Sequence, residues 1–242
     1  MQQNDKLYFA NAGDSRAIVG RQLDQNQLGQ PVTMNQLKNI TKQVTTDHKP
    51  HVPEERQRIE QYGSCVIESA DDCSRVAGML AVSRAIGDAP FKGCGVIATP
   101  EVFCVQAIDV EYVVIACDGL WDVLNNEEVG FIIQCVLAEL EGNTINTPDP
   151  TLKTIGTAVH LFLQSETLAD DSSSQAEREL AKLSQYDCPT SDSADIVAHY
   201  QRPEERFAPT NIAKILAKTA VAMGSEDNVS VVVGVKQSVY QK

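Results

Sequence analysis

Four aspartates could together bind a metal ion: Asp14, Asp118, Asp122 and Asp227. Each lies near the end of a predicted strand or just before one. Divalent cations such as Mg²⁺ prefer oxygen ligands, and Mg²⁺ keeps several waters while taking only a few protein carboxylates. Carboxylates from separate loops at one rim of a sheet therefore predict a Mg²⁺ or Mn²⁺ site. The alternative is that these aspartates make turns and caps, which is the commoner role for any single aspartate.

The segment ACDGLWDVL, residues 116–124, is the most informative of these sites. The apolar run YVVIAC before it, residues 112–117, predicts a buried strand. Asp118 then lies at the carboxyl end of that strand, and Gly119 lets the chain turn there without a side-chain clash. Trp121 and the apolar residues after it can anchor the turn against a core. Asp122 is therefore expected to face the same side of this turn as Asp118, at the carboxyl end of the strand.

Composition narrows the class of protein. The chain has 242 residues and is 43% apolar, which is ordinary for a globular protein. Lys and Arg total 20 against 33 for Asp and Glu, a net charge of -13, so we expect no nucleic-acid partner. Seven cysteines without CxxC pairs favour a reducing, intracellular location, cytoplasmic or nuclear. We also expect no signal peptide and no membrane span.

Local patterns predict elements on both sides of these aspartates. Residues 7–20 resemble a hairpin of two apolar strands, and the Gln- and Asn-rich residues 22–43 are interpreted as a loop of low complexity. Further strands are expected at 44–46, 65–67, 102–105, 112–117 and 229–235. Helices are expected from Pro53 to Gly63, from Asn125 with an apolar face, and from Asn211 to Gly224.

Residues 143–205 differ from the rest of the chain. An amphipathic helix is expected near its start, at Leu152 to Leu163, and a tract with DDSSS and SDSAD follows. This composition predicts a solvated, partly disordered acidic insertion that cannot bury enough apolar surface to order itself. It is also a candidate surface for a protein partner.

Six segments occur in an order that resembles a known family. They are FANAGDSRAIV, TTDHKP, RVAGMLAVSRAIGD, VIATPEV, VIACDGLWDVL and GSEDNVSVVVG. Together they resemble the carboxyl-terminal part of the catalytic domain of the protein phosphatase 2C family, which are metal-dependent serine/threonine phosphatases. The resemblance covers residues 7–141 and 207–236, so we expect one such domain over 1–242, interrupted at about 143–205.

The resemblance implies a fold and a reaction. The fold is α+β, an αββα sandwich of two antiparallel sheets flanked by helices. Two to three Mg²⁺ or Mn²⁺ ions would bind at one edge of the sheets, and a water or hydroxide bridging two of them would attack the phosphorus of phosphoserine or phosphothreonine in proteins. By match to the family's motifs, Asp118 and Asp227 would bind one ion of the pair, and Asp14 and Asp122 a third, weaker position.

Other motif residues are assigned structural roles. Asn228 would fix the loop after Asp227, and Ser83, Arg84 and Asp88 would make structural hydrogen bonds. His48 and Lys49 are interpreted as parts of a turn. Met79 and Leu80 are expected in the core, and Cys117 is interpreted as a buried thiol.

The chain departs from the family at its beginning. The family's leading Arg, Glu-Asp pair and Asp-Gly-His-Gly-Gly motif have no match here, so no residue is assigned as phosphate-binding Arg, general-acid His or bridging carboxylate. We expect the first strands and helix of the domain to be absent, either because the chain is the later part of a longer phosphatase or because its gene start is misplaced. The competing hypothesis is a catalytically inactive, phosphatase-like interaction module, which the missing ligands favour.

Overall fold

The computed structural model describes residues 2–3, 5–24, 30–68, 73–165, 172–183 and 209–236, and the chain divides into two compact units. The first unit comprises Met1–Ala17 and Val44–Ala107, and the second comprises Ile18–Gln43 and Ile108–Lys242. Among the helices described, none is long and apolar enough to cross a membrane.

The first unit contains a three-stranded sheet, a two-stranded sheet and helix α3. The larger sheet has the order β1-β2-β7, and the antiparallel pair β2–β7 runs from Lys6 opposite Gln106 to Asn11 opposite Glu101. The bounds in this unit are β1 Gln2–Gln3, β2 Lys6–Asn11, α3 Pro53–Gln61, β5 Val66–Glu68, β6 Ser74–Val76, the 3₁₀ helix η1 Ala89–Cys94 and β7 Glu101–Gln106.

Helix α3 forms where the sequence predicts it. Pro53 at the first helical position has its φ already set for a helix, and two glutamates lie in the first turn. Gly63 ends the helix with φ at 78°, in the left-handed region. Ile59 is fully buried and packs with Val66, Val76 and Val96 in a small core.

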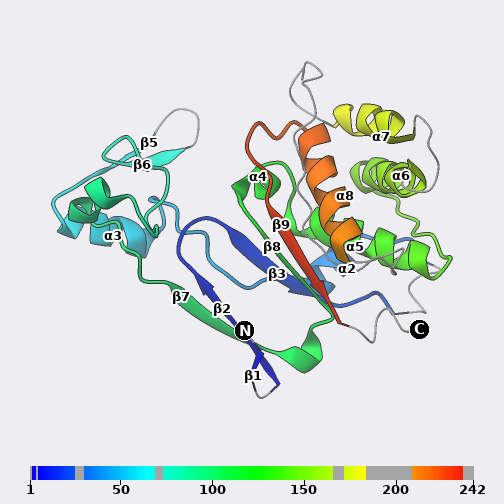
Figure 1. Ribbon diagram of the computed structural model, residues 1–242, viewed down its shortest axis with the longest axis horizontal. Helices are drawn as coiled ribbons and strands as arrows, with labels where there is room; N and C mark the ends of the chain where they lie inside the picture. Colours follow the sequence, from blue (N-terminus) through cyan, green and yellow to red (C-terminus); the bar gives the residue numbers. More distant parts are fainter. Residues whose placement is uncertain are drawn as a thin grey trace. The chain divides into compact units, whose positions relative to one another are not determined.

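The second unit is a four-stranded sheet with helices on one face, as Figure 1 shows for α5 and α8. The strand order is β4-β3-β8-β9, and β8 pairs antiparallel with β9 from Tyr112 opposite Val235 to Ala116 opposite Val231. The bounds are β3 Arg16–Gly20, α2 Met34–Ile40, β4 Thr41–Gln43, η2 Ala107–Asp109, β8 Tyr112–Ala116, α4 Asp118–Trp121, α5 Asn126–Leu140, α6 Pro150–Ser165, α7 Ser172–Ala181, α8 Pro209–Ala222 and β9 Val231–Val235.

The main core lies between this sheet and its helices. Alternate residues of β8, namely Tyr112, Val114 and Ala116, are buried, as the period of two in a strand requires. Helix α5 begins at a capping box in which the Asn125 side chain accepts from the amide of Glu128 at 2.9 Å. This local signal explains why the start of α5 was predictable.

A buried polar contact ties β4 to β8 inside this core. The hydroxyl of Tyr112 lies 2.8 Å from Oγ1 of Thr41, and burial raises the pKa of Tyr112 to about 12. Gly20 on β3 makes room for the tyrosine, because a Cβ there would lie 2.1 Å from Cζ and from the hydroxyl oxygen of Tyr112. Only glycine therefore fits at this position without moving the ring.

Replacing Gly20 with Ala should destabilise the second unit by about 1–3 kcal/mol, because the new methyl group overlaps a buried ring. Urea unfolding followed by the fluorescence of Trp121, the chain's single tryptophan, measures this change. Gly234→Ala is the matched control, since Gly234 lies in β9 of the same sheet and a Cβ there meets nothing within 4 Å. Equal stabilities for the two variants would contradict the prediction.

The α+β class and the antiparallel sheets predicted from the sequence are confirmed. The helices at α3, α5 and α8 and the strands at β7, β8 and β9 also match, although α8 begins at Pro209 rather than after Asn211 and β9 begins at Val231. The expectation of one domain over 1–242 with an insertion at 143–205 stays a prediction.

The predicted hairpin over 7–20 is wrong. β2 pairs with β7, whereas β3 pairs with β4 and β8, so the two strands belong to different sheets. The residues between them make their hydrogen bonds elsewhere: the amide of His48 donates to the carbonyl of Gly13 at 3.0 Å. A long-range partner thus replaces the cross-strand bonds that a hairpin needs.

Two further segments are more ordered than the sequence suggested. Residues 22–43 are not all loop, because α2 and β4 form there, with a capping box between Thr33 and Gln36 and Leu37 fully buried. The Ser-rich tract is not all solvated, because helix α7 forms and buries Ala176 and Leu180 in the main core. The polar composition of both segments argued against helices α2 and α7. They form nevertheless, because a few well-spaced apolar residues are enough to bury one face of a helix. The SDSAD part of the tract lies outside the described residues.

Candidate metal-binding site

The turn after β8 positions Asp118 at the first residue of the short helix α4. The indole Nε1 of Trp121 donates to the carbonyl of Ala116 at 2.9 Å, and Leu120 is fully buried, so the turn is anchored on both sides. Oδ1 of the half-buried Asp118 accepts from the amide of Gly119 at 3.1 Å. The anchoring role expected for Trp121 is confirmed.

The loop 225–230 lies directly against this turn. The Ser225 hydroxyl donates to the carbonyl of Gly119 at 2.6 Å, and the Cys117 thiol donates to the carbonyl of Asn228 at 3.0 Å. The amide of Ser230 in turn donates to the sulfur of Cys117 at 3.2 Å. Two segments more than 100 residues apart in the chain are thus joined by these three hydrogen bonds.

Close packing of the two backbones depends on Gly119. A Cβ at this residue would lie 2.5 Å from the carbonyl oxygen of Asn228, which is too close for two non-bonded atoms. Asp227, exposed, lies next to Asn228, and its Oδ1 accepts from the Asn228 amide at 2.7 Å. The structure therefore brings Asp118 and Asp227 onto adjoining loops of the second unit.

Two carboxylates on adjoining loops fit a single hydrated cation. Mg²⁺ is commonly bound through one or two carboxylates and keeps several waters. Within the described ranges, no group of three or more His, Cys, Asp and Glu residues is arranged to hold a metal ion. Asp118 and Asp227 can therefore supply part of a coordination shell, and water or substrate oxygens would complete it.

The other two predicted ligands are placed differently. Asp122 follows α4 as its C-cap, and its amide donates to the carbonyl of Asp118 at 2.8 Å, while its side chain is exposed. Asp14 belongs to the first unit, where its carboxylate forms an ion pair with Lys49 at 2.5 Å. Asp122 and Asp118 thus lie at opposite ends of the short helix α4, and Asp14 already has a cationic partner.

The DHK residues of TTDHKP hold the GDSR loop within the first unit. Asp47 forms an ion pair with Arg16 at 2.6 Å, Lys49 with Asp14, and Nδ1 of the buried His48 lies 3.2 Å from the amide of Gly13. His48 and Lys49 thus bind the GDSR loop, a partner of this turn that sequence reasoning missed. The only sign of this pairing in the sequence was that GDSR and TTDHKP each contain an aspartate and a basic residue.

Sequence reasoning also missed Glu55 of α3. This carboxylate is 2% exposed and accepts from Arg58 at 2.6 Å, from Arg84 at 2.7 Å and from the Ser83 hydroxyl at 2.5 Å. Burial alone would raise the pKa of Glu55, but these donors together hold it well below its usual range. The structural role expected for Ser83 and Arg84 is confirmed.

Two single-residue expectations need correction. Met79 is not in the core, because its side chain is 62% exposed, whereas Leu80 packs partly buried beside the small core of the first unit. Cys117 is only half-buried, and its thiol has a direct role in joining the two loops of the candidate site. Neither feature has a signal in the local sequence.

Comparison with known proteins gives the family. The family model of protein phosphatase 2C matches residues 1–148, more than half of the chain. "Probable protein phosphatase 2C 8" of Arabidopsis thaliana is 35% identical over 146 residues, which are 59% of this chain and 40% of that protein. The integrin-linked kinase-associated serine/threonine phosphatase 2C of Bos taurus is 37% identical over 135 residues, 55% of this chain and 32% of that protein.

These matches cover only part of each relative. They span less than half the length of either relative, and Asp118 lies within the matched part of the family model whereas Asp227 lies beyond it. Among solved structures, a C. elegans sex determining protein superposes with a TM-score of 0.56 at 21% identity, covering 98% of this chain and 39% of that one, which supports the fold alone. On the family model and these relatives together, the chain belongs to the protein phosphatase 2C family.

Proposed function

We propose that the protein is a metal-dependent phosphatase that hydrolyses phosphoserine and phosphothreonine in other proteins. The observation that carries the proposal is the contact between the Cys117–Gly119 turn and the 225–230 loop, which bear Asp118 and Asp227. Family membership and the names of the relatives support the reaction class. The competing interaction-module hypothesis has no such support.

In this proposal Asp118 and Asp227 hold Mg²⁺ or Mn²⁺ through carboxylate oxygens. When bound, the cation supplies an activated water and neutralises charge on the phosphoryl oxygens. The chain's own residues keep the two carboxylates in place: Trp121 anchors one loop, and Cys117 and Ser225 join it to the other. A bound cation would also offset the repulsion between two carboxylates on adjoining loops.

The family resemblance assigns Asp122 and Asp14 to a further, weaker ion, and this assignment stays a prediction because the two residues belong to different units. Asp122 is exposed and one helical turn from Asp118. For Asp14, binding a cation competes with the ion pair to Lys49. We therefore expect Lys49→Met to strengthen cation binding at Asp14.

The test measures phosphate release from a phosphothreonine peptide. The protein is expressed in its own cells with a carboxyl-terminal tag and is purified through that tag. Hydrolysis should require Mg²⁺ or Mn²⁺ and should fall at least about 100-fold in Asp118→Ala and in Asp227→Ala, since each removes charge that holds the cation. Asp109→Ala, an exposed carboxylate paired with Arg21, is the control. Hydrolysis that persists in EDTA or in both variants would contradict the proposal.

A further inference from the structure

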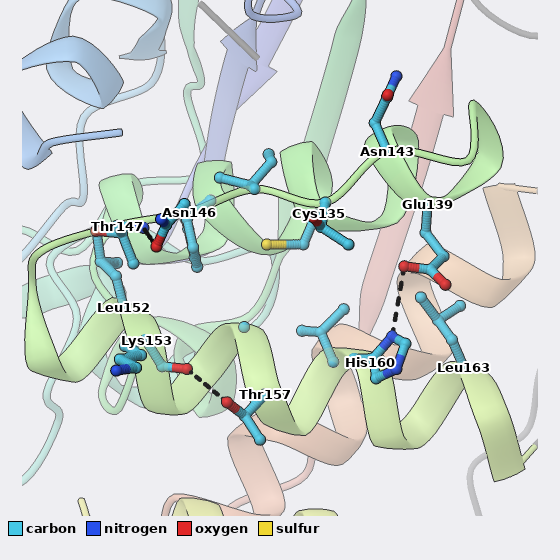
Figure 2. Close-up of a pocket in the computed structure, with 15 residues that line it drawn as sticks. Cys135, Glu139, Asn143, Asn146, Thr147, Leu152, Lys153, Thr157, His160 and Leu163 are labelled. Atoms are coloured by element: carbon cyan, nitrogen blue, oxygen red, sulfur yellow. Dashed lines mark hydrogen bonds and ion pairs between the residues drawn. The ribbon is translucent and has the colours of Figure 1, made fainter. Parts of the chain in front are cut away.

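A second candidate site lies in the helical part of the second unit, away from the aspartates. A pocket of about 310 Å³ opens between α5, α6 and the connecting residues 143–147, as Figure 2 shows. Its volume is at the lower end of the range of small-ligand pockets, about 300–1,000 Å³. The lining includes Phe131, Leu152 and Val159, which are buried in the main core, so its floor is apolar.

Gly156 on α6 lines this pocket where α6 packs closely against α5. A Cβ at this position would lie 3.4 and 3.5 Å from the ring of Phe131 and 3.8 Å from the sulfur of Cys135. These are ordinary van der Waals distances, so the missing side chain is room that a methyl group would fill without strain. The two helices therefore approach closely at Gly156, and the apolar floor of the pocket is formed by side chains such as Phe131 and Leu152.

The charged lining residues decide the sign of the ligand. Glu139 lies 3.4 Å from Nδ1 of His160, and Figure 2 shows these two side chains facing each other from α5 and α6. The carboxylate of Glu139 therefore has a neighbouring partner at this end of the pocket. Lys153 lies near the other end of the pocket, about 10 Å from His160 along the helix axis.

Lys153 is the cation that remains available to a ligand. Its side chain is exposed, and no ion pair to its ammonium group is found in the described part of the chain. Asp149, just before α6, accepts from the amides of Thr151 and Leu152 at 3.0 and 3.1 Å as a helix cap. An anionic group entering at this end of the pocket therefore meets one positive charge beside an apolar floor.

We propose that this pocket binds a small amphiphilic monocarboxylate. Its apolar body would lie against the apolar floor that includes Phe131 and Leu152, and its carboxylate would pair with Lys153. The site uses neither Asp118 nor Asp227, so it goes beyond the phosphatase function and does not depend on it. Because the chain's net charge of -13 opposes any anion at long range, the attraction has to come from Lys153 itself.

The experiment is calorimetric titration of the 242-residue chain with octanoate, with octan-1-ol and octylammonium as uncharged and cationic probes of the same length. Octanoate should bind with unit stoichiometry and more tightly than either comparison compound. Lys153→Met should weaken octanoate binding about tenfold or more, because it removes a charge-assisted contact, while Lys153→Arg keeps it. Lys38→Met, an exposed helical lysine outside the pocket, is the matched control.

Two variants at the floor test the location. Gly156→Leu should abolish octanoate binding, and Gly156→Ala, whose methyl group fits beside Phe131, should keep the fold and weaken binding less. Circular dichroism checks that both variants fold. The proposal is overturned if wild-type protein does not bind octanoate, if octylammonium binds equally well, or if folded Lys153→Met and Gly156→Ala proteins both bind octanoate as wild type does.

Discussion

Replacing Glu55 with Gln is expected to lower the free energy of unfolding of the first unit by about 3 kcal/mol, since it leaves two guanidinium groups without their carboxylate. Arg58, Arg84 and Ser83 all donate to this one side chain, which is 2% exposed. The value is at the low end for buried pairs because the two arginines are 18% and 14% exposed.

The control for this prediction lies on the same helix. Glu60 pairs with Arg56 at 3.1 Å, but both side chains are exposed to water, so Glu60→Gln should leave the stability unchanged. Trp121 belongs to the second unit, so the measurement is hydrogen exchange of the α3 backbone amides together with urea unfolding followed by circular dichroism. Unchanged protection of α3 in Glu55→Gln would show that the network adds little.

The same network makes stability depend on pH. The pKa of Glu55 is lowered in the folded state, so the unfolded chain binds its proton more readily, with an ordinary pKa of about 4.3. The contribution of Glu55 to stability is therefore complete above about pH 5 and is lost as the pH falls below that value. Between about pH 5 and 3, wild type should lose stability more steeply than Glu55→Gln.

Replacing Gly119 with Ala should weaken Mn²⁺ binding about tenfold or more while every proposed ligand stays in place, because relief of the clash costs at least about 1.4 kcal/mol of cation binding. The added Cβ would lie 2.5 Å from the carbonyl oxygen of Asn228, which is backbone and cannot rotate away. The turn and the 225–230 loop must separate, and Asp118 and Asp227 separate with them.

Gly234→Ala is again the control, because a Cβ at that strand position meets nothing within 4 Å. Binding is measured from the electron paramagnetic resonance signal of free Mn²⁺. Trp121 fluorescence shows whether the anchored turn remains folded. An unchanged dissociation constant in Gly119→Ala would mean that close packing of these two loops has no part in cation binding.

The parts of the fold that were predictable are those with local causes. Alternating buried residues mark β8, Pro53 and Gly63 bound α3, and Asn125 with Glu128 marks the start of α5. Each signal lies within a few residues of the element that it defines. The turn at Asp118 was predictable for the same reason, because the strand, the glycine and the tryptophan follow one another in the chain.

The parts that were not predictable depend on distant partners. The contacts between Gly13 and His48 join residues 35 apart, and Glu55 meets Arg84 across 29 residues. In the sequence, Glu55 is only one acidic residue in a first helical turn, and His48 only one residue of a turn. Neither role can be inferred without the tertiary structure. In that structure β2 and β3 belong to different sheets, whereas the local sequence pattern had predicted that they form one hairpin.

The central claim is that Asp118 and Asp227 together hold one divalent cation, and direct Mn²⁺ binding tests it. Titrations compare wild type, Asp118→Asn, Asp227→Asn and the control Asp109→Asn, an exposed carboxylate of the same unit. The account predicts that Asp118→Asn and Asp227→Asn each weaken the tightest Mn²⁺ site at least about tenfold, and that Asp109→Asn leaves it unchanged. Equal affinity in wild type and both site variants would contradict it.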